Sequence, residues 1–225
     1  MFKSEARPIN IPQYEHGRLA GIFALLWGNE NFDKPAIDFA SFVQGVALHD
    51  WHYGPVDNLP IREASEGEWL TMVRKGVEQW FANPTTDIVT KLHLKRLLSG
   101  RESPEISELV SQLELRLAER LPQTSFTREH FEWADRITAF CDDLAFDFSF
   151  EKPVEETLLL PTKIHSSEET PITYIIRPNG EIWVVPWPFS QPSFSGIIVG
   201  YERPGYPEKL KPKVIPYHCQ LRNLS

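Results

Sequence analysis

The chain has 225 residues, and its hydrophobic content of 41% is enough for one large domain or for a domain with a smaller attachment. The formal net charge is −8, and the acidic excess lies in the first 150 residues, which argues against a surface that coats nucleic acid. No apolar run approaches the roughly 18 residues that span a bilayer, and the N-terminus lacks the apolar core of a signal peptide. We therefore expect a cytoplasmic protein without membrane contact.

Hydrophobic periodicity predicts helices through the first two thirds of the chain. Within residues 13–27, an apolar stripe with spacing i, i+3, i+4 and i+7 contains His16, Leu19, Ala20 and Phe23. Further helices are expected after a cap at Asp33 and after a cap at Thr127, and over three ranges between them: 69–81, 86–98 and 103–122.

The pattern changes after residue 150. Eleven of the 19 prolines lie there, and proline breaks helices. The β-branched segments 172–176 and 182–185 flank Asn179-Gly180, which predicts a hairpin, and 196–201 is a further expected strand. The sequence thus predicts a mainly α chain, α+β overall. Residues 1–150 would form a helical bundle, and 151–225 a small, proline-rich β attachment packed on it.

Polar residues that can bind a metal lie on the inward side or at the ends of four predicted helices: His16, the pair His49-Asp50, His93 and Asp142. Imidazole and carboxylate groups together suit a divalent transition metal. Each position alone is more often an ordinary core or loop residue, and Asp143 could be the inward carboxylate in place of its neighbour. Four inward polar clusters on four helices indicate one shared centre, which would hold iron, manganese, nickel or zinc, as one ion or two.

The order His, His-Asp, His, Asp on successive helices resembles the HD superfamily of metal-dependent phosphohydrolases. More specifically, the chain resembles a bacterial domain-of-unknown-function family, number 3891, which has an HD-like pattern. The similar blocks are 13–29, 47–50 with Asp57 and Pro60 after it, 88–93, 141–146 and 185–189. The family's usual Gly and Trp after the His-Asp pair are here His52 and Tyr53. The resemblance implies an HD-domain-like metal-binding fold for residues 1–150.

This similarity predicts hydrolysis of a small phosphorylated substrate, with a nucleotide among the candidates and a metal-bound water as the nucleophile. Asp50 would hold or accept the proton, and Asp57 would orient water or a leaving group. Cations and rings near the centre would bind the substrate: Arg62, Lys95, Arg96, Trp51, Tyr53 and His52.

Two other functions fit the same residues. An HD-type di-iron oxygenase would need further ligands, for which His52 is a candidate. A protein that binds a metal or a small molecule without catalysis would use the polar centre as a structural or sensing site.

Overall fold

The computed structural model describes residues 1–54, 57–164 and 168–222. Within these ranges the helices are α1 (Gln13–Leu26), α2 (Phe39–Ala47), α3 (Glu66–Glu78), α4 (Pro84–Leu98), α5 (Pro104–Arg120) and α6 (Arg128–Ser149), with short 3-10 turns η1 (Trp51–Tyr53) and η2 (Leu121–Gln123). The strands are β1 (Phe2–Lys3), β2 (Ile9–Ile11), β3 (Val154–Pro161), β4 (Glu169–Ile176), β5 (Glu181–Val185), β6 (Ser193–Glu202) and β7 (Pro212–Leu221).

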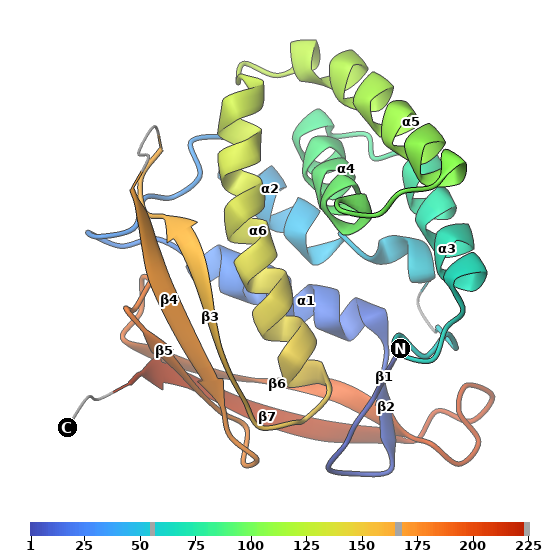
Figure 1. Ribbon diagram of the computed structural model, residues 1–225. Coiled ribbons are helices and arrows are strands. Elements are labelled where there is room, and N and C mark those ends of the chain that lie inside the picture. The colour runs from blue at the N-terminus through green and yellow to red at the C-terminus, as the bar shows by residue number, and fades with distance from the viewer. Residues whose placement is uncertain (55–56, 165–167, 223–225) are drawn as a thin grey trace.

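The strands form one curled mixed sheet in the order β1-β2-β6-β7-β5-β4-β3 (Figure 1). Neighbouring strands are antiparallel, except that β5 runs parallel to β7. The expectation of a mainly α, HD-domain-like bundle with a small β attachment is therefore wrong: this is an α+β fold with a seven-stranded sheet. Strands β1 and β2 lie within the range 1–150 that was predicted to form a helical bundle; β1 pairs with β2, and β2 pairs with β6, at one end of the sheet. The domain boundary at residue 150 stays a prediction.

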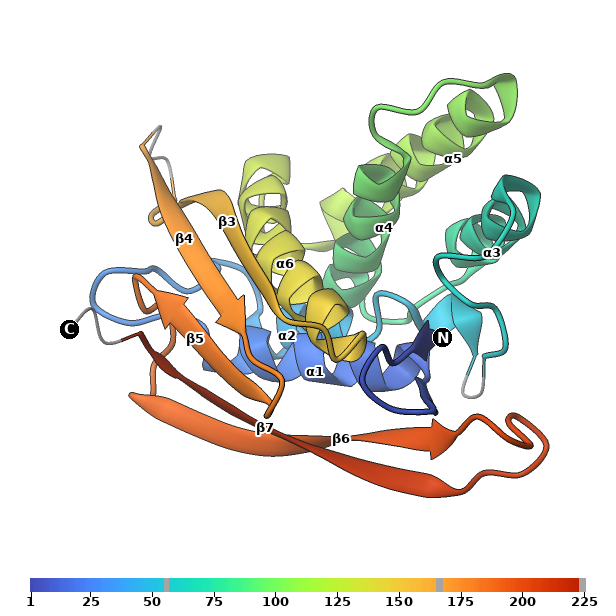
Figure 2. The same ribbon diagram turned by 60° about the horizontal axis from the view of Figure 1, so that its bottom comes forward.

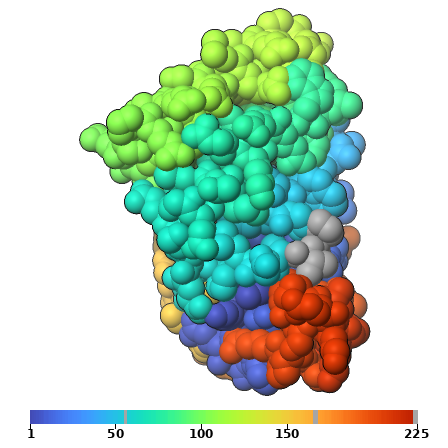
Figure 3. Space-filling view, turned by 90° about the vertical axis from the view of Figure 1, so that its right-hand side faces the viewer, coloured from blue at the N-terminus to red at the C-terminus, as the bar shows by residue number. Residues whose placement is uncertain are grey.

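The sheet curls around α1 and α6, and α3, α4 and α5 lie on the side of α6 that faces away from β3, β4 and β5 (Figure 2). Helix α1 contacts β6, and α6 contacts β3 and β4. On the side shown in Figure 3, α3 and α5 form the upper surface, and the connection between β6 and β7 lies at the bottom beside the N-terminal segment. No helix in the described part of the chain is long and apolar enough to cross a membrane.

Local side-chain chemistry explains where the helices begin. Helix α2 starts at Phe39 rather than near Asp33, because the carboxylate of Asp38 accepts a hydrogen bond from the Ser41 amide at 2.8 Å. Ser65 and Glu68 form a capping box that starts α3 earlier than predicted. The helices predicted from residue 13 and after Thr127 are confirmed as α1 and α6.

The hairpin predicted around Asn179-Gly180 is confirmed as β4 and β5, and Gly180 has a φ of +82°, which glycine adopts without strain. Strand β7 was missed because it contains Pro212 and Pro216. Its parallel partner β5 pairs only with residues 218–221. Both prolines therefore lie where β7 has one neighbouring strand, and there a missing backbone N–H is tolerated.

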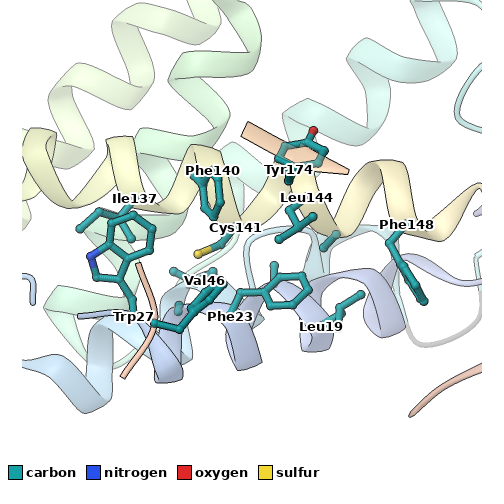
Figure 4. Close-up of a cluster of buried hydrophobic side chains, with 14 of the residues drawn as sticks. Leu19, Phe23, Trp27, Val46, Ile137, Phe140, Cys141, Leu144, Phe148 and Tyr174 are labelled. Atoms are coloured by element: carbon teal, nitrogen blue, oxygen red, sulfur yellow. The ribbon is translucent and has the colours of Figure 1, made fainter. Parts of the chain in front are cut away.

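The main apolar core lies between α1, α6 and the sheet (Figure 4). Phe23 of α1 is fully buried, with its ring centroid 6.0 Å from that of Phe189 and 6.1 Å from that of Phe194. The amide of Asn29 donates hydrogen bonds to the carbonyls of Trp187 at 2.8 Å and Phe189 at 3.2 Å. The connection between β5 and β6, which contains Trp187 and Phe189, thus attaches the sheet to the end of α1. A second apolar cluster joins α3, α4 and α5.

Two nearby positions on α1, one buried and one exposed, test this packing. Replacing Phe23 by Ala is expected to lower the free energy of unfolding by about 3–5 kcal/mol, because it leaves a cavity between helix and sheet. Leu25→Ala is the control, since that side chain is 52% exposed and its loss is expected to change stability by no more than about 0.5 kcal/mol. Denaturant unfolding measures both, and equal losses would contradict this account of the core.

Candidate metal centre

Two glycines on α1 set the distance between α1 and α2. A Cβ atom on Gly17 would lie 2.8 Å from the carbonyl oxygen of Ala47, and one on Gly21 would lie 2.6 Å from the Ala47 Cβ. Only glycine permits this approach without movement of one helix. The contact places His16, beside Gly17, close to His49, which lies two residues after the end of α2.

Two imidazoles and one carboxylate converge where α1, α2 and α6 meet. The Nε2 atoms of His16 and His49 are 3.0 Å apart. Oδ1 of Asp142 lies 3.1 Å from the first and 3.3 Å from the second. A metal about 2.1 Å from each ligand would separate the ligand atoms by about 3.0 Å at right angles and about 3.4 Å at tetrahedral angles. The observed separations fit that range.

Asp50 adds a second carboxylate to this centre. Its Oδ2 atom lies 3.5 Å from Nε2 of His49 and 3.6 Å from Nε2 of His16. Its Oδ1 atom lies 3.4 Å from Nε2 of His93. Two overlapping groups of residues are therefore close enough to hold an ion: His16, His49 and Asp142, and His49, Asp50 and His93.

Hydrogen bonding and charge prepare the centre for a cation. Nδ1 of His49 lies 2.6 Å from the Val46 carbonyl. Because a carbonyl only accepts, Nδ1 is the donor, and Nε2 faces the carboxylates. Burial alone would lower the pKa of His49, but Asp50 and Asp142 hold it well above its usual value. Burial would raise the pKa of both carboxyls, but the histidines, His49 foremost, hold them well below their usual range. Both carboxylates therefore stay ionised, and a divalent ion bound beside them would displace the proton that His49 holds on Nε2.

The centre opens into a cleft with a volume of about 580 Å³. The guanidinium of Arg101 lies over the ring of Trp69, 4.3 Å from its centroid, and both residues line the cleft with Arg96 and Tyr53. Asp142 and Asp143 both line it, but of the two only Asp142 belongs to a group of described residues that could hold an ion, so Asp142 is the carboxylate that joins the centre. The cleft combines cations and aromatic rings next to the candidate metal ligands.

Residues 2–200 match the model of a family of proteins of unknown function, DUF3891. The chain belongs to this family. The predicted family is thereby confirmed, whereas the relation to the HD superfamily rests on the order of residues alone. No curated protein and no solved structure matches the chain. The region shared with DUF3891 includes every residue of the candidate centre and all of α1 to α6.

Other predicted site residues of this DUF3891 protein lie outside the cleft. Among the described residues that line it, four predicted substrate contacts are missing: Trp51, His52, Arg62 and Lys95. Their contacts show where they are held instead. Lys95 pairs with Glu114 of α5, Arg62 lies over the ring of Phe150, and Trp51 is 45% exposed.

His52, which is half-buried, and Asp57, which is buried, lie at positions that support the helices. The His52 ring packs on Gly76 of α3, and burial lowers its pKa to about 4. Asp57 accepts a hydrogen bond from the Gln13 amide at 2.7 Å and contacts the backbone nitrogen of Met1. Since Pro12 provides no side-chain cap, Asp57 caps α1 from a distant part of the chain. Its predicted direct part in the chemistry stays a prediction.

Sequence reasoning missed the spacing glycines and Arg101. Gly17 directly follows His16, and Gly21 comes four residues later, so both glycines lie on one face of the helix. This spacing is the signal by which they could have been found. Arg101 follows the end of α4 in a short connection, where no periodic pattern indicates which way a side chain points.

The spacing of α1 and α2 can be tested with one added methyl group. Gly21→Ala is expected to cost about 1–3 kcal/mol of stability through overpacking, and to weaken zinc binding because His16 moves away from His49. Gly67→Ala on α3 is the control, since a Cβ there meets nothing within 4 Å, and stability should hold or rise by up to about 1 kcal/mol. Unfolding curves and zinc titrations of both variants give the answer. A Gly21→Ala protein with normal stability and zinc affinity would contradict this role.

Proposed function

We propose that this protein is a metal-dependent hydrolase of a small phosphorylated substrate, with a centre of the HD type. The observation that carries the proposal is the convergence of His16, His49, Asp50 and Asp142 beside an open cleft lined by two arginines. Their order along the chain, His, His-Asp, Asp, is the order of the HD pattern. A sheet around the helices is compatible with such a centre, because function depends on the site rather than on the whole fold.

The donor set suits iron, manganese, nickel or zinc, which accept mixed nitrogen and oxygen ligands. A divalent ion held there would supply Lewis-acid activation of a phosphoryl group and of water. Asp50 borders both the candidate ligands and the cleft, so its carboxylate is placed to hold a proton released by water.

The cleft provides the groups that a phosphorylated substrate needs. Arg101 is a cation for the non-bridging phosphoryl oxygens, and Arg96, which is held against Asp135 and Asp142, adds positive charge beside the candidate ligands. Tyr53 and Trp69 offer ring faces to a sugar or a base. At about 580 Å³, the cleft falls within the size range of small-molecule sites, roughly 300–1,000 Å³.

A di-iron oxygenase is a second candidate, because His49, Asp50 and His93 form a further group that could hold an ion. It requires His93 to be a ligand and two ions to bind per chain. Metal counting together with an iron spectrum separates the two functions.

Elemental analysis tests the shared centre. The purified protein is expected to retain a divalent transition metal, and His16→Ala, His49→Ala and Asp142→Ala are each expected to lose most of it, because each removes a ligand. His218→Ala is the matched control, since that imidazole bonds to Ser195 on the sheet, away from the centre. Unchanged metal content in all three ligand variants would refute the centre.

Turnover is tested with a panel of phosphomonoesters, including nucleotides, in the presence of manganese, zinc, nickel or iron. We expect phosphate release that Asp142→Asn abolishes. Arg101→Met should lower kcat/KM about 10-fold, because a charged hydrogen bond to the substrate is lost. Arg74→Met is the control, since that side chain pairs with Glu105 outside the cleft. Absence of turnover with every metal and substrate, but thermal stabilisation by one of these compounds, would favour a binding protein.

A further inference from the structure

Each carboxylate of the centre has two oxygens in different surroundings. Asp142 directs Oδ1 toward the His16 and His49 nitrogens, while its Oδ2 lies 3.4 Å from Nη1 of Arg96. Asp50 directs Oδ2 toward the same nitrogens, while its Oδ1 lies 3.4 Å from Nε2 of His93. One oxygen of each residue therefore faces the position of the ion, and the other faces the pair Arg96 and His93.

The contact between Arg96 and His93 determines which nitrogen of His93 carries the proton. Nη2 of Arg96 lies 3.2 Å from Nδ1 of His93. A guanidinium has donors only, so Nδ1 must accept. A neutral His93 that accepts from Arg96 carries its proton on Nε2, which lies 3.4 Å from Oδ1 of Asp50 without a hydrogen bond to any described residue. A metal on Nε2 would need that proton to move to Nδ1, where it would oppose the donors of Arg96, although Oδ2 of Asp142 is also 3.3 Å from Nδ1.

Arg96 is itself held in place for this contact. Its Nε atom donates a hydrogen bond to Oδ2 of Asp135 at 3.3 Å, and its Nη1 atom lies beside Asp142. With three of its nitrogens engaged, the guanidinium has a fixed orientation. A continuous series of contacts therefore runs from Asp135 through Arg96 and His93 to Asp50.

We infer that His93 is not a metal ligand but a positioning residue, which together with Arg96 orients the two carboxylate ligands of the ion. This inference rests on the metal centre of the proposed function and deepens it. The ion would have four protein donors: His16, His49, Asp50 and Asp142. A four-donor set leaves more coordination positions for water and substrate than a five-donor set, and it removes the second group that a dinuclear oxygenase needs.

Matched glutamine and leucine variants separate a positioning role from ligation. In His93→Gln the amide can still accept from Arg96 and donate to Asp50, so zinc affinity should stay within about threefold of the original. In His93→Leu both contacts are lost, and the affinity should fall about 10- to 100-fold. His16→Gln provides the comparison at a ligand, where the same substitution should remove zinc binding. If His93→Gln lost zinc as completely as His16→Gln, His93 would be a ligand and the inference would be overturned.

The identity of the His93 nitrogen that carries the proton can be measured directly. A merely structural role of His93 would not make it depend on Arg96. Nitrogen-15 NMR of the imidazole is expected to show the proton on Nε2 in both metal-free and zinc-loaded protein. Arg96→Met should shift it to Nδ1, because Oδ2 of Asp142, 3.3 Å away, then becomes the available acceptor. Arg101→Met removes a cation from the same cleft and should leave the proton on Nε2. Zinc bound to Nε2 of His93 in the original protein would overturn the inference.

These measurements do not depend on turnover. If no phosphorylated substrate is hydrolysed, the zinc affinities and the NMR spectra still decide the role of His93. If the original protein binds no divalent ion, the proposed function and this inference fail together.

Discussion

The structure depends on one electrostatic constraint, which is that two carboxylates are buried at the meeting point of three helices. A buried carboxylate without compensation costs several kcal/mol. Asp50 and Asp142 both face the imidazoles of His16 and His49, and Asp142 is compensated in addition by the guanidinium of Arg96. Each of these groups comes from a different part of the chain, so the helices must keep their relative positions for the charges to remain compensated.

The sheet provides that fixed frame. The carboxylate of Glu15 on α1 accepts a hydrogen bond from the Val199 amide of β6 at 2.7 Å. The hydroxyl of Tyr174 on β4 donates to Asp147 of α6 at 2.7 Å. Helices α1 and α6, which provide His16 and Asp142, are therefore both tied to the curled sheet as well as packed on it. The sheet is part of what positions the centre and is not an attachment to a separate bundle.

The residues of the centre could be predicted from sequence because polar side chains interrupt apolar helix faces. His16 and Asp142 stand among residues that are otherwise buried and apolar, and such positions need a partner. The overall fold could not be predicted in the same way. Strands β1 and β2 are two and three residues long, too short for an alternating pattern to register. Strand β7 contains prolines, which are disfavoured inside sheets. They are tolerated because β5 pairs only with residues 218–221, which leaves the part of β7 that holds the prolines with a single neighbouring strand.

Contacts between distant residues were also beyond sequence reasoning, and they change what individual residues do. Asp57 follows the His-Asp pair closely in sequence, and its carboxylate caps α1 at the Gln13 amide, whereas its predicted part in catalysis is untested. Lys91 lies two residues from His93, yet its ammonium donates to the carbonyls of Gly76 and Gln79 at the end of α3, at 2.8 and 2.6 Å. Both charges stabilise helix ends beside the centre. The charges left to act on a ligand are those of the cleft itself. Under the proposed function, a phosphoryl group would therefore be bound by an arginine of the cleft such as Arg101 rather than by Lys91, whose donors are engaged with backbone carbonyls.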